Sequence, residues 1–169
     1  MDARSDIRKA SFWVSNLFII AATVLGVFLA ATQGFEQAVQ FDNLRGDKNN
    51  YYMRQSLRGE LADNAGYVKE YIAKVSNQVV SPQLVLEDFV WNNMTYAANA
   101  LETPTELLRE AQRFHRRVTE IMATPHFNDR MKAQHLGELV KHLEENVLPA
   151  FDADIEALAK SLKARNVDL

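Results

Sequence analysis

The chain has 169 residues, 47% hydrophobic and 24% charged, which is the composition of one globular domain with room for a further element. With 19 basic and 22 acidic residues, its net charge of −3 offers no positive field to attract nucleic acid, so no nucleic-acid partner is expected. The absence of cysteine excludes disulfides, thiol nucleophiles and cysteine-ligated metal sites. Only 6 glycines and 4 prolines argue against a fold of many strands and favour helices.

The first predicted element is a transmembrane helix. From Ala10 to Phe35, 26 consecutive residues carry no formal charge, and a helix from Phe12 to Ala31 would cover about 30 Å, the thickness of a bilayer's hydrocarbon core. A cleaved signal peptide is the alternative, but its apolar core is shorter, about 7 to 15 residues. We therefore expect a short cytoplasmic leader at residues 1–10, a transmembrane helix at 11–34 and an extracytoplasmic helical domain at 35–169.

The charges that flank this span predict its orientation. Arg4, Arg8 and Lys9 precede it, whereas the first basic residues beyond it are Arg45 and Lys48. Because lysine and arginine concentrate on the cytoplasmic side of membrane helices, we expect the N-terminus in the cytoplasm. The domain that follows would then be periplasmic or extracellular, on a protein of the inner (cytoplasmic) membrane.

One face of the predicted span is made of small residues. Ala22, Gly26 and Ala30 are spaced four apart, which places them in line along a helix. Small residues at this spacing let a second helix approach closely within lipid. They predict a partner-binding face for another membrane subunit or for a second copy of the chain. The alternative is ordinary composition, because alanine and glycine are common in membrane helices.

The prolines of the domain recur at intervals of 22, 21 and 24 residues. They are Pro82, Pro104, Pro125 and Pro149. Three follow a serine or threonine, which is typical of a helix start because proline at the first helical position leaves no N–H without a partner. Thr103 and Glu106 complete a capping box. The fold class predicted is all-α, a single N-terminal transmembrane helix followed by an extracytoplasmic up-and-down bundle of about four to five helices.

Apolar residues at spacings of three and four mark the helices of this bundle. The predicted helices run from about Lys48 to Gln78, from Pro82 to about Leu101, from Pro104 to Ala123 and from Pro125 toward Lys163. Pro149 should kink or break the last one. In the first, Gly59, Gly66 and Ala73 recur every seven residues, which suggests close approach of a neighbour, with two tolerated glycines as the alternative. The second is apolar on nearly all sides and favours a covering partner.

A second candidate partner-binding face is basic. It consists of Arg109, Arg113, Arg116 and Arg117. Such a face suits an acidic protein or anionic lipid headgroups. The alternative is an exposed surface of intrahelical ion pairs, because Glu106, Glu110 and Glu120 lie three or four residues from these arginines.

Histidines offer the only candidate metal ligands. His135, Glu138 and His142 share one helical face, but the two histidines lie two turns apart, about 10 Å along the axis, so a solvated polar face is the better interpretation. No nucleophile with a base and no glycine-rich phosphate loop is present in the sequence. We therefore expect no metal, no other cofactor, no catalytic residue and no enzyme activity.

These features indicate a non-catalytic single-pass membrane protein whose helical domain binds or stabilises partners in a membrane-associated complex, as an accessory or scaffold subunit. The layout resembles small single-span accessory subunits of bacterial inner-membrane assemblies. It is more loosely similar to the periplasmic bundles of chemoreceptors and sensor kinases, which however return to a cytoplasmic output domain. Expected partners are the lipid bilayer and membrane protein subunits, including a second copy. The alternative function is a binding or sensing module that holds a small molecule, lipid or metal between its helices.

Overall fold

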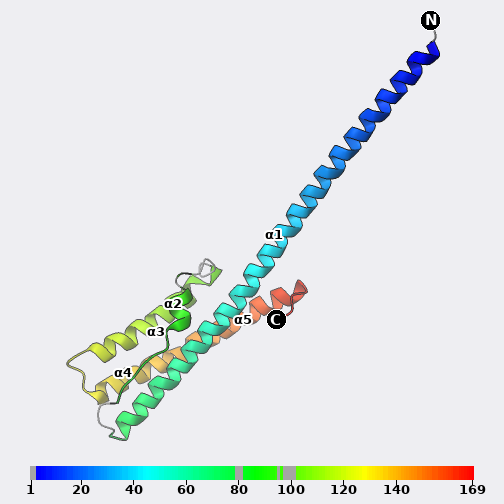
Figure 1. Ribbon diagram of the computed structural model, residues 1–169. Coiled ribbons are helices and arrows are strands. Elements are labelled where there is room, and N and C mark those ends of the chain that lie inside the picture. The colour runs from blue at the N-terminus through cyan, green and yellow to red at the C-terminus, as the bar shows by residue number, and fades with distance from the viewer. Residues whose placement is uncertain (1–2, 79–81, 95, 97–101) are drawn as a thin grey trace. The chain divides into compact units, whose positions relative to one another are not determined.

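A computed structural model describes residues 3–78, 82–94, 96 and 102–169, with the backbone alone for residues 3–11 (Figure 1). The structure is about 85% helical and the described part of the chain contains no strand, which confirms the predicted all-α class. The chain divides into two compact units, an N-terminal unit of Met1–Asn43 and a C-terminal unit of Leu44–Leu169.

The first helix, α1 (Ala3–Ser76), contributes residues to both units. It includes the apolar run and is apolar enough to cross a membrane. The predicted span ends at residue 34, whereas α1 continues to Ser76. No proline interrupts the chain before Pro82, and Gly34 and Gly46 each cost a helix only about 1 kcal/mol. The predicted span and the helix predicted from about Lys48 are therefore parts of one element.

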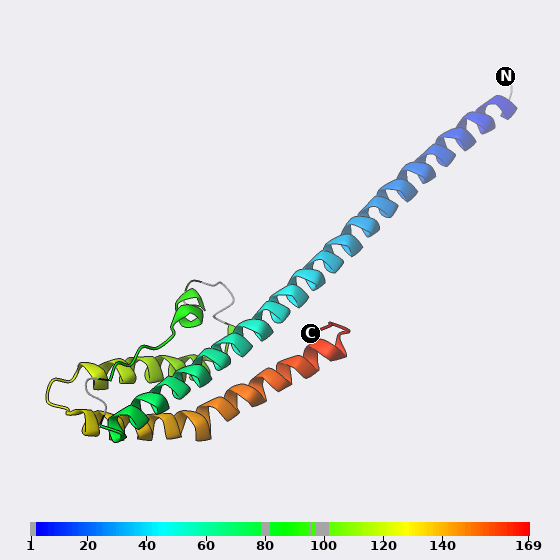
Figure 2. The same cartoon turned by 60° about the horizontal axis from the view of Figure 1, so that its bottom comes forward.

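The core of the C-terminal unit is formed by residues 44–76 of α1 together with three further elements. These are α3 (Thr105–Ala123), α4 (Asp129–His142) and α5 (Leu148–Ala164), and they lie beside that part of α1 in both views (Figures 1 and 2). The predicted apolar stripes supply the buried side chains. Among them are Leu57, Leu61, Ala65, Val68, Ala111, Phe114, Val118, Leu136, Val140, Phe151 and Leu162.

Ion pairs tie α1 to α5 in an antiparallel order. Arg54 meets Asp154 at 2.8 Å, and Arg58 holds both oxygens of Asp152 at 2.8 and 3.0 Å. Residue numbers therefore rise along α1 as they fall along α5. The side chain of Arg54 is only 9% exposed, and it also donates to the carbonyl oxygen of Glu102 at 2.5 Å. This buried pair fixes the register of the two helices more firmly than an exposed pair would.

The helix predicted from Pro82 is wrong for the first seven residues of that range. Residues 82–88 are not helical, and α2 is a short helix, Phe89–Met94. Ser81 and the end of the predicted helix, residues 95 and 97–101, lie outside the described residues. The backbone of this segment is held by a side chain of α1, Asn64, at Glu87. A contact between residues so far apart in the sequence cannot be predicted from the local capping signal at Pro82.

The predicted start at Pro104 is correct to one residue, but the capping box is wrong. Pro104 itself occupies the N-cap position, no side chain caps the helix, and α3 begins at Thr105. The side chain of Thr103 is buried instead. Its hydroxyl forms no hydrogen bond with the described part of the chain, so it does not cap the helix.

Pro125 does not begin a helix either. The N-cap of α4 is Asn128, whose side-chain oxygen accepts a hydrogen bond from the backbone N–H of Met131 at 2.9 Å. Asparagine at this position stabilises a helix end by about 1 kcal/mol. The helix therefore starts four residues later than the Thr-Pro signal suggested, at Asp129 rather than at Pro125.

Pro149 lies inside a continuous helical run. Between α4 and α5 the backbone forms a π-helical turn, η2 (Leu143–Val147), and Pro149 is the second residue of α5. The N–H of Leu148 donates to the carbonyl of Leu143, five residues back. The wider turn leaves room for the proline ring, which would crowd a regular α-helix. The expected break is thus replaced by a local widening.

Candidate interaction surfaces

The apolar side chains of the N-terminal unit form an uncovered surface. No side chain from residue 12 to 43 is buried, and large residues such as Trp13 and Phe28 are 72% and 66% exposed. The hydroxyls of Thr23 and Thr32 donate to the carbonyls four residues earlier, at 2.8 and 2.5 Å. Apolar surface on this scale needs lipid or protein to cover it, and the internally bonded hydroxyls suit either environment.

The predicted small-residue face lies on this surface. Ala22, Gly26 and Ala30 are all exposed, and no atom lies within 4 Å of a Cβ built on Gly26. The face is open along its length, so a second helix could contact it without displacing any described side chain. Its role in partner binding stays a prediction.

The other glycine pattern has no close neighbour in the part of the chain that the structure describes. A Cβ built on Gly59 or Gly66 meets nothing there within 4 Å. The close approach suggested by the spacing of these glycines is therefore not made by the described residues, and the interpretation of two tolerated glycines accounts for them.

All four arginines of the predicted basic face take part in the intrahelical pairs that the sequence suggested. The pairs are Arg109–Glu106 at 3.0 Å, Arg113–Glu110 at 2.9 Å, Arg116–Glu120 at 3.5 Å and Arg117–Glu120 at 3.2 Å. The arginine side chains are 51–66% exposed, so each pair contributes at most about 1 kcal/mol. The guanidinium groups remain accessible, and docking on this face stays a prediction.

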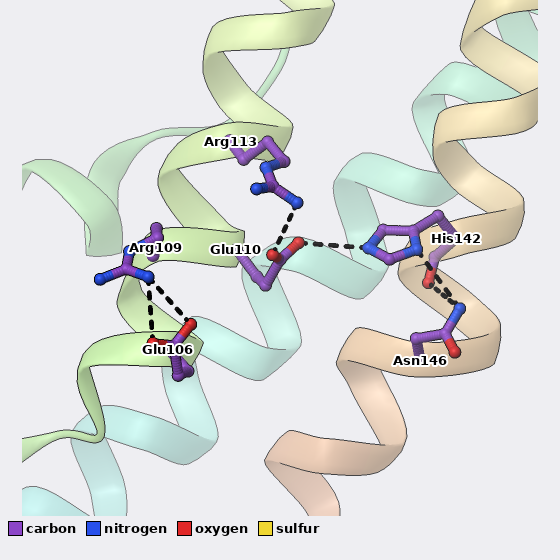
Figure 3. Close-up of polar contacts among 6 residues, drawn as sticks. All are labelled: Glu106, Arg109, Glu110, Arg113, His142 and Asn146. Carbon is purple, nitrogen blue, oxygen red and sulfur yellow. Dashed lines mark hydrogen bonds and ion pairs between the residues drawn. The ribbon is translucent and has the colours of Figure 1, made fainter.

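Glu110 connects α3 to His142, the last residue of α4 (Figure 3). One of its carboxylate oxygens pairs with Arg113, and the other lies 3.2 Å from Nε2 of His142. The amide of Asn146 contacts the same histidine at Nδ1. The imidazole of His142 is therefore engaged by an adjacent helix through Glu110.

The other members of the predicted histidine face are placed differently. His135 stacks on Phe127 with ring centroids 5.0 Å apart, and its Nδ1 lies 4.0 Å from Glu138. These three side chains and His142 border a hollow of about 450 Å³ between α3 and α4. No group of three or more His, Asp or Glu among the described residues is placed to hold a metal ion.

The 82–88 segment is bound to α1 by a buried asparagine. Asn64 is fully buried, its amide nitrogen donates to the carbonyl of Glu87 at 2.7 Å, and its amide oxygen accepts from the N–H of Glu87 at 2.7 Å. The hydroxyl of Tyr67 donates to the Glu87 carboxylate at 2.6 Å. One side chain of α1 thus pairs with an extended backbone as a neighbouring strand would.

Glu60, four residues earlier on α1, holds the start of α2. Its buried carboxylate accepts hydrogen bonds from the N–H groups of Val90 at 2.5 Å and Trp91 at 3.0 Å. These are first-turn N–H groups that have no partner within a helix. Burial raises the pKa of Glu60, and the two N–H bonds oppose that rise.

His115 of α3 packs against this arrangement. Its ring stacks on Trp91 with centroids 5.9 Å apart, and its Nε2 lies 3.8 Å from Glu60, beyond hydrogen-bond distance. Burial lowers the pKa of His115, and the negative charge of Asp88 partly opposes that change. A buried imidazole and a buried carboxylate therefore face each other without a direct bond.

The 82–88 segment, α2 and α3 border a groove of about 950 Å³, called here the α2–α3 groove. Its apolar lining residues are Leu84, Val85, Leu86, Trp91, Val118, Met122 and Ala123, and its polar ones are Asp88, Asn92, His115, Arg116, Thr119 and Glu120. This groove was not predicted from the sequence. The only available signal was that Glu60 and Asn64 lie four residues apart beside the apolar stripe, which does not distinguish them from surface residues.

Comparison with known proteins gives no family for this chain. No known protein family matches the sequence, and no curated protein or solved structure matches it either.

Proposed function

We propose that the chain is a non-catalytic single-pass membrane protein whose helical domain binds or stabilises partners in a membrane-associated complex. In this proposal the span at residues 11–34 lies in the inner (cytoplasmic) membrane with the N-terminus in the cytoplasm. The domain at residues 35–169 is a helical bundle in the periplasm or outside the cell. The protein acts as an accessory or scaffold subunit rather than as an enzyme.

The observation that carries this proposal is the uncovered apolar surface of the N-terminal unit. Its large side chains, such as Leu17, Ile20 and Leu25, are more than half exposed. Each would contribute about 1.5 to 3 kcal/mol if it were fully removed from water. A bilayer supplies that removal over the length of the run, and the basic residues that precede it support a cytoplasmic N-terminus.

The proposed partners are membrane protein subunits or a second copy, and two sets of residues are proposed to bind them. The first is the small-residue face, Ala22, Gly26 and Ala30. The second is the basic face, Arg109, Arg113, Arg116 and Arg117. Exposed apolar residues of the domain, Val85 and Phe89, support the idea that it too meets a partner.

Extraction and sizing of the full-length protein from its native membrane test this proposal. The chain should resist alkaline extraction, should dissolve in mild detergent, and should then migrate as a complex larger than one chain in its micelle. Mass spectrometry of that complex identifies the partner. Release by alkali, or a monomer as the sole species in mild detergent, would contradict the proposal.

A second candidate function is a binding or sensing module for a small molecule, lipid or metal. The observation that favours it is the hollow of about 450 Å³ where His135, Glu138 and His142 meet Phe127. Ligand pockets in helical proteins have similar sizes and a similar mixture of aromatic and polar lining. A saturable shift in thermal unfolding with an added small-molecule or lipid probe, lost in His135→Ala, would support this function over the first.

A further inference from the structure

The outer edge of the α2–α3 groove carries large apolar side chains that face solvent. Val85 and Phe89 are each 77% exposed, while Leu84, Leu86 and Trp91 beside them pack on the core. Val85 lines the groove, and Phe89, the first residue of α2, directly follows Asp88, which also lines it; Val85 and Phe89 are called here the rim. Contiguous exposed apolar surface of this kind marks a site of interaction.

The 82–88 segment contributes the negative charge of Asp88 to the groove, whereas α3 contributes Arg116 and Glu120, whose opposite charges pair with each other. From Val75 to Leu108, 34 residues include four acidic residues and no lysine or arginine. Asp88 lines the groove, and its carboxylate forms no ion pair with any residue of the described ranges. On the opposite wall, Glu120 contacts Arg116 and Arg117 on its own helix.

The groove is also preformed, which favours binding. One wall consists of the 82–88 segment and the six-residue helix α2. Hydrogen bonds of the buried side chains Asn64 and Glu60 fix this wall to α1. A partner would therefore not have to order this wall, and the entropy cost of association is reduced.

From these observations we propose that the α2–α3 groove docks a basic amphipathic segment of a partner protein. Apolar side chains of the segment pack against Trp91 and the rim at Phe89, and its lysine or arginine side chains meet Asp88. The negative charge of Asp88 disfavours an anionic lipid surface, because like charges repel and the carboxylate would lose hydration. This inference rests on the proposed partner-binding function and assigns one surface and one partner chemistry to it.

Fluorescence of the full chain in zwitterionic lipid nanodiscs tests the groove directly. The chain has 2 tryptophans, so Trp13→Phe leaves Trp91 as the sole reporter at the groove. Three synthetic peptides serve as probes: an amphipathic Lys/Leu helix, its Glu/Leu counterpart, and a Lys/Leu peptide scrambled to remove the apolar face. The expected result is a saturable change in Trp91 emission with the amphipathic Lys/Leu peptide alone.

Substitutions at the groove should weaken this binding. Asp88→Asn removes one charge-assisted contact and is expected to reduce affinity about tenfold, and Phe89→Ser should reduce it by a similar factor. Asp63→Asn and Met131→Ser remove a comparable exposed charge and apolar side chain elsewhere and should have little effect. Equal binding by all four variants, or equal response to the Glu/Leu peptide, would overturn the proposal.

A crosslink in native membranes separates failure of this inference from failure of the proposed function. The chain lacks cysteine, so Phe89→Cys accepts a photoreactive maleimide at one position. The expected adduct is a partner peptide with alternating basic and apolar residues. If partners co-purify with Asp88→Asn and Phe89→Ser as with the unchanged chain and no such adduct forms, the groove inference fails and the function stands. If no partner co-purifies at all, the function fails.

Discussion

Asn64 satisfies both polar backbone groups of Glu87, a residue 23 positions away. Asn64→Leu keeps a similar volume but leaves the partly buried N–H and C=O of Glu87 without their partners, and a buried group that loses its partner costs about 1 to 3 kcal/mol. We expect the free energy of unfolding in urea to fall by about 2 kcal/mol or more. Hydrogen exchange at residues 84–91 should accelerate before exchange elsewhere.

The matched control for this variant is Asn49→Leu, because Asn49 is an exposed asparagine on the same helix. Its effect should be within about 0.5 kcal/mol, as is usual for surface substitutions. Equal destabilisation by the two variants would mean that the amide of Asn64 does not hold the 82–88 segment.

His115 gives the stability of the C-terminal unit a dependence on pH. Because burial lowers its pKa in the folded state below the usual 6.5, its contribution to stability is present above pH 6.5 and is lost as the pH falls through the folded-state pKa. Glu60, with a raised pKa, contributes in the opposite sense: its contribution is full below pH 4.5 and is lost as the pH rises through its folded-state pKa.

The prediction for His115→Gln follows from these signs. Between about pH 7.5 and 5.5, the urea midpoint of the unchanged chain should fall more steeply than that of the variant, which has no imidazole to protonate. His126→Gln, at an exposed histidine, should leave the slope unchanged. Parallel profiles for His115→Gln and the unchanged chain would contradict this role of His115.

At the level of single residues, the apolar stripes could be predicted because helical periodicity determines which side chains face a core. Leu57, Leu61 and Phe114 are buried as expected. The buried polar residues could not be predicted in the same way. Asn64 and Glu60 are buried because a segment more than 20 residues later packs on them, and that pairing leaves no local pattern.

The π-helical turn is the element whose geometry is least expected. A turn closed between residues 143 and 148 contains one residue more than an α-helical turn. This extra residue changes the register, so Val147 and Leu148 are both buried while the stripes of α4 and α5 both face the core. The turn therefore behaves as a single inserted residue in an otherwise regular helix.

This interpretation predicts an unusual tolerance to deletion. Removing the exposed Glu145, together with Pro149→Ala to relieve the ring clash, should convert the turn to α-helix and keep both stripes on the core. Helix content by circular dichroism should be unchanged and the free energy of unfolding should shift by less than about 1 kcal/mol.

The control is deletion of the exposed Gln112 in the middle of α3. It rotates Phe114 and Val118 by about 100° away from the core, which should cost several kcal/mol. If deletion of Glu145 is as damaging as deletion of Gln112, the π-helical turn is not equivalent to an insertion.

The proline pattern shows how far local signals predict elements. The start of α3 at Pro104 was correct to one residue, and the long-range hydrogen bond from Arg54 to the carbonyl oxygen of Glu102 is compatible with that start. The start at Pro82 was wrong because Asn64 binds the backbone of Glu87 in a non-helical conformation, and Glu60 accepts from the first-turn N–H groups of α2, which begins at Phe89. The start at Pro125 was wrong because the stronger Asn128 cap follows it closely.

At the scale of the whole molecule, the proposed orientation of the chain rests on the basic residues Arg4, Arg8 and Lys9. A periplasm-active reporter fused after Leu169 should be active, and a cytoplasm-active reporter at the same site should be silent. Replacing the three basic residues by glutamine should reduce this difference, because the charge bias is then lost. Activity of the cytoplasmic reporter in the unchanged chain would reverse the proposed topology.

The proposed association through the membrane helix can be tested by substitution of a single residue. Gly26→Leu places a branched side chain on the face shared with Ala22 and Ala30, while the span remains as hydrophobic as before. If two backbones meet at this face, overpacking should cost about 1 to 3 kcal/mol, or roughly 5- to 150-fold in the association constant. Leu25→Ala alters a different face of the same helix, so it should change association much less. Co-purification of the full-length protein with its partner or with itself, at equal membrane insertion, measures the difference. Equal recovery of the two variants would show that the span only tethers the chain, and that any partner is held by the helices of the C-terminal unit.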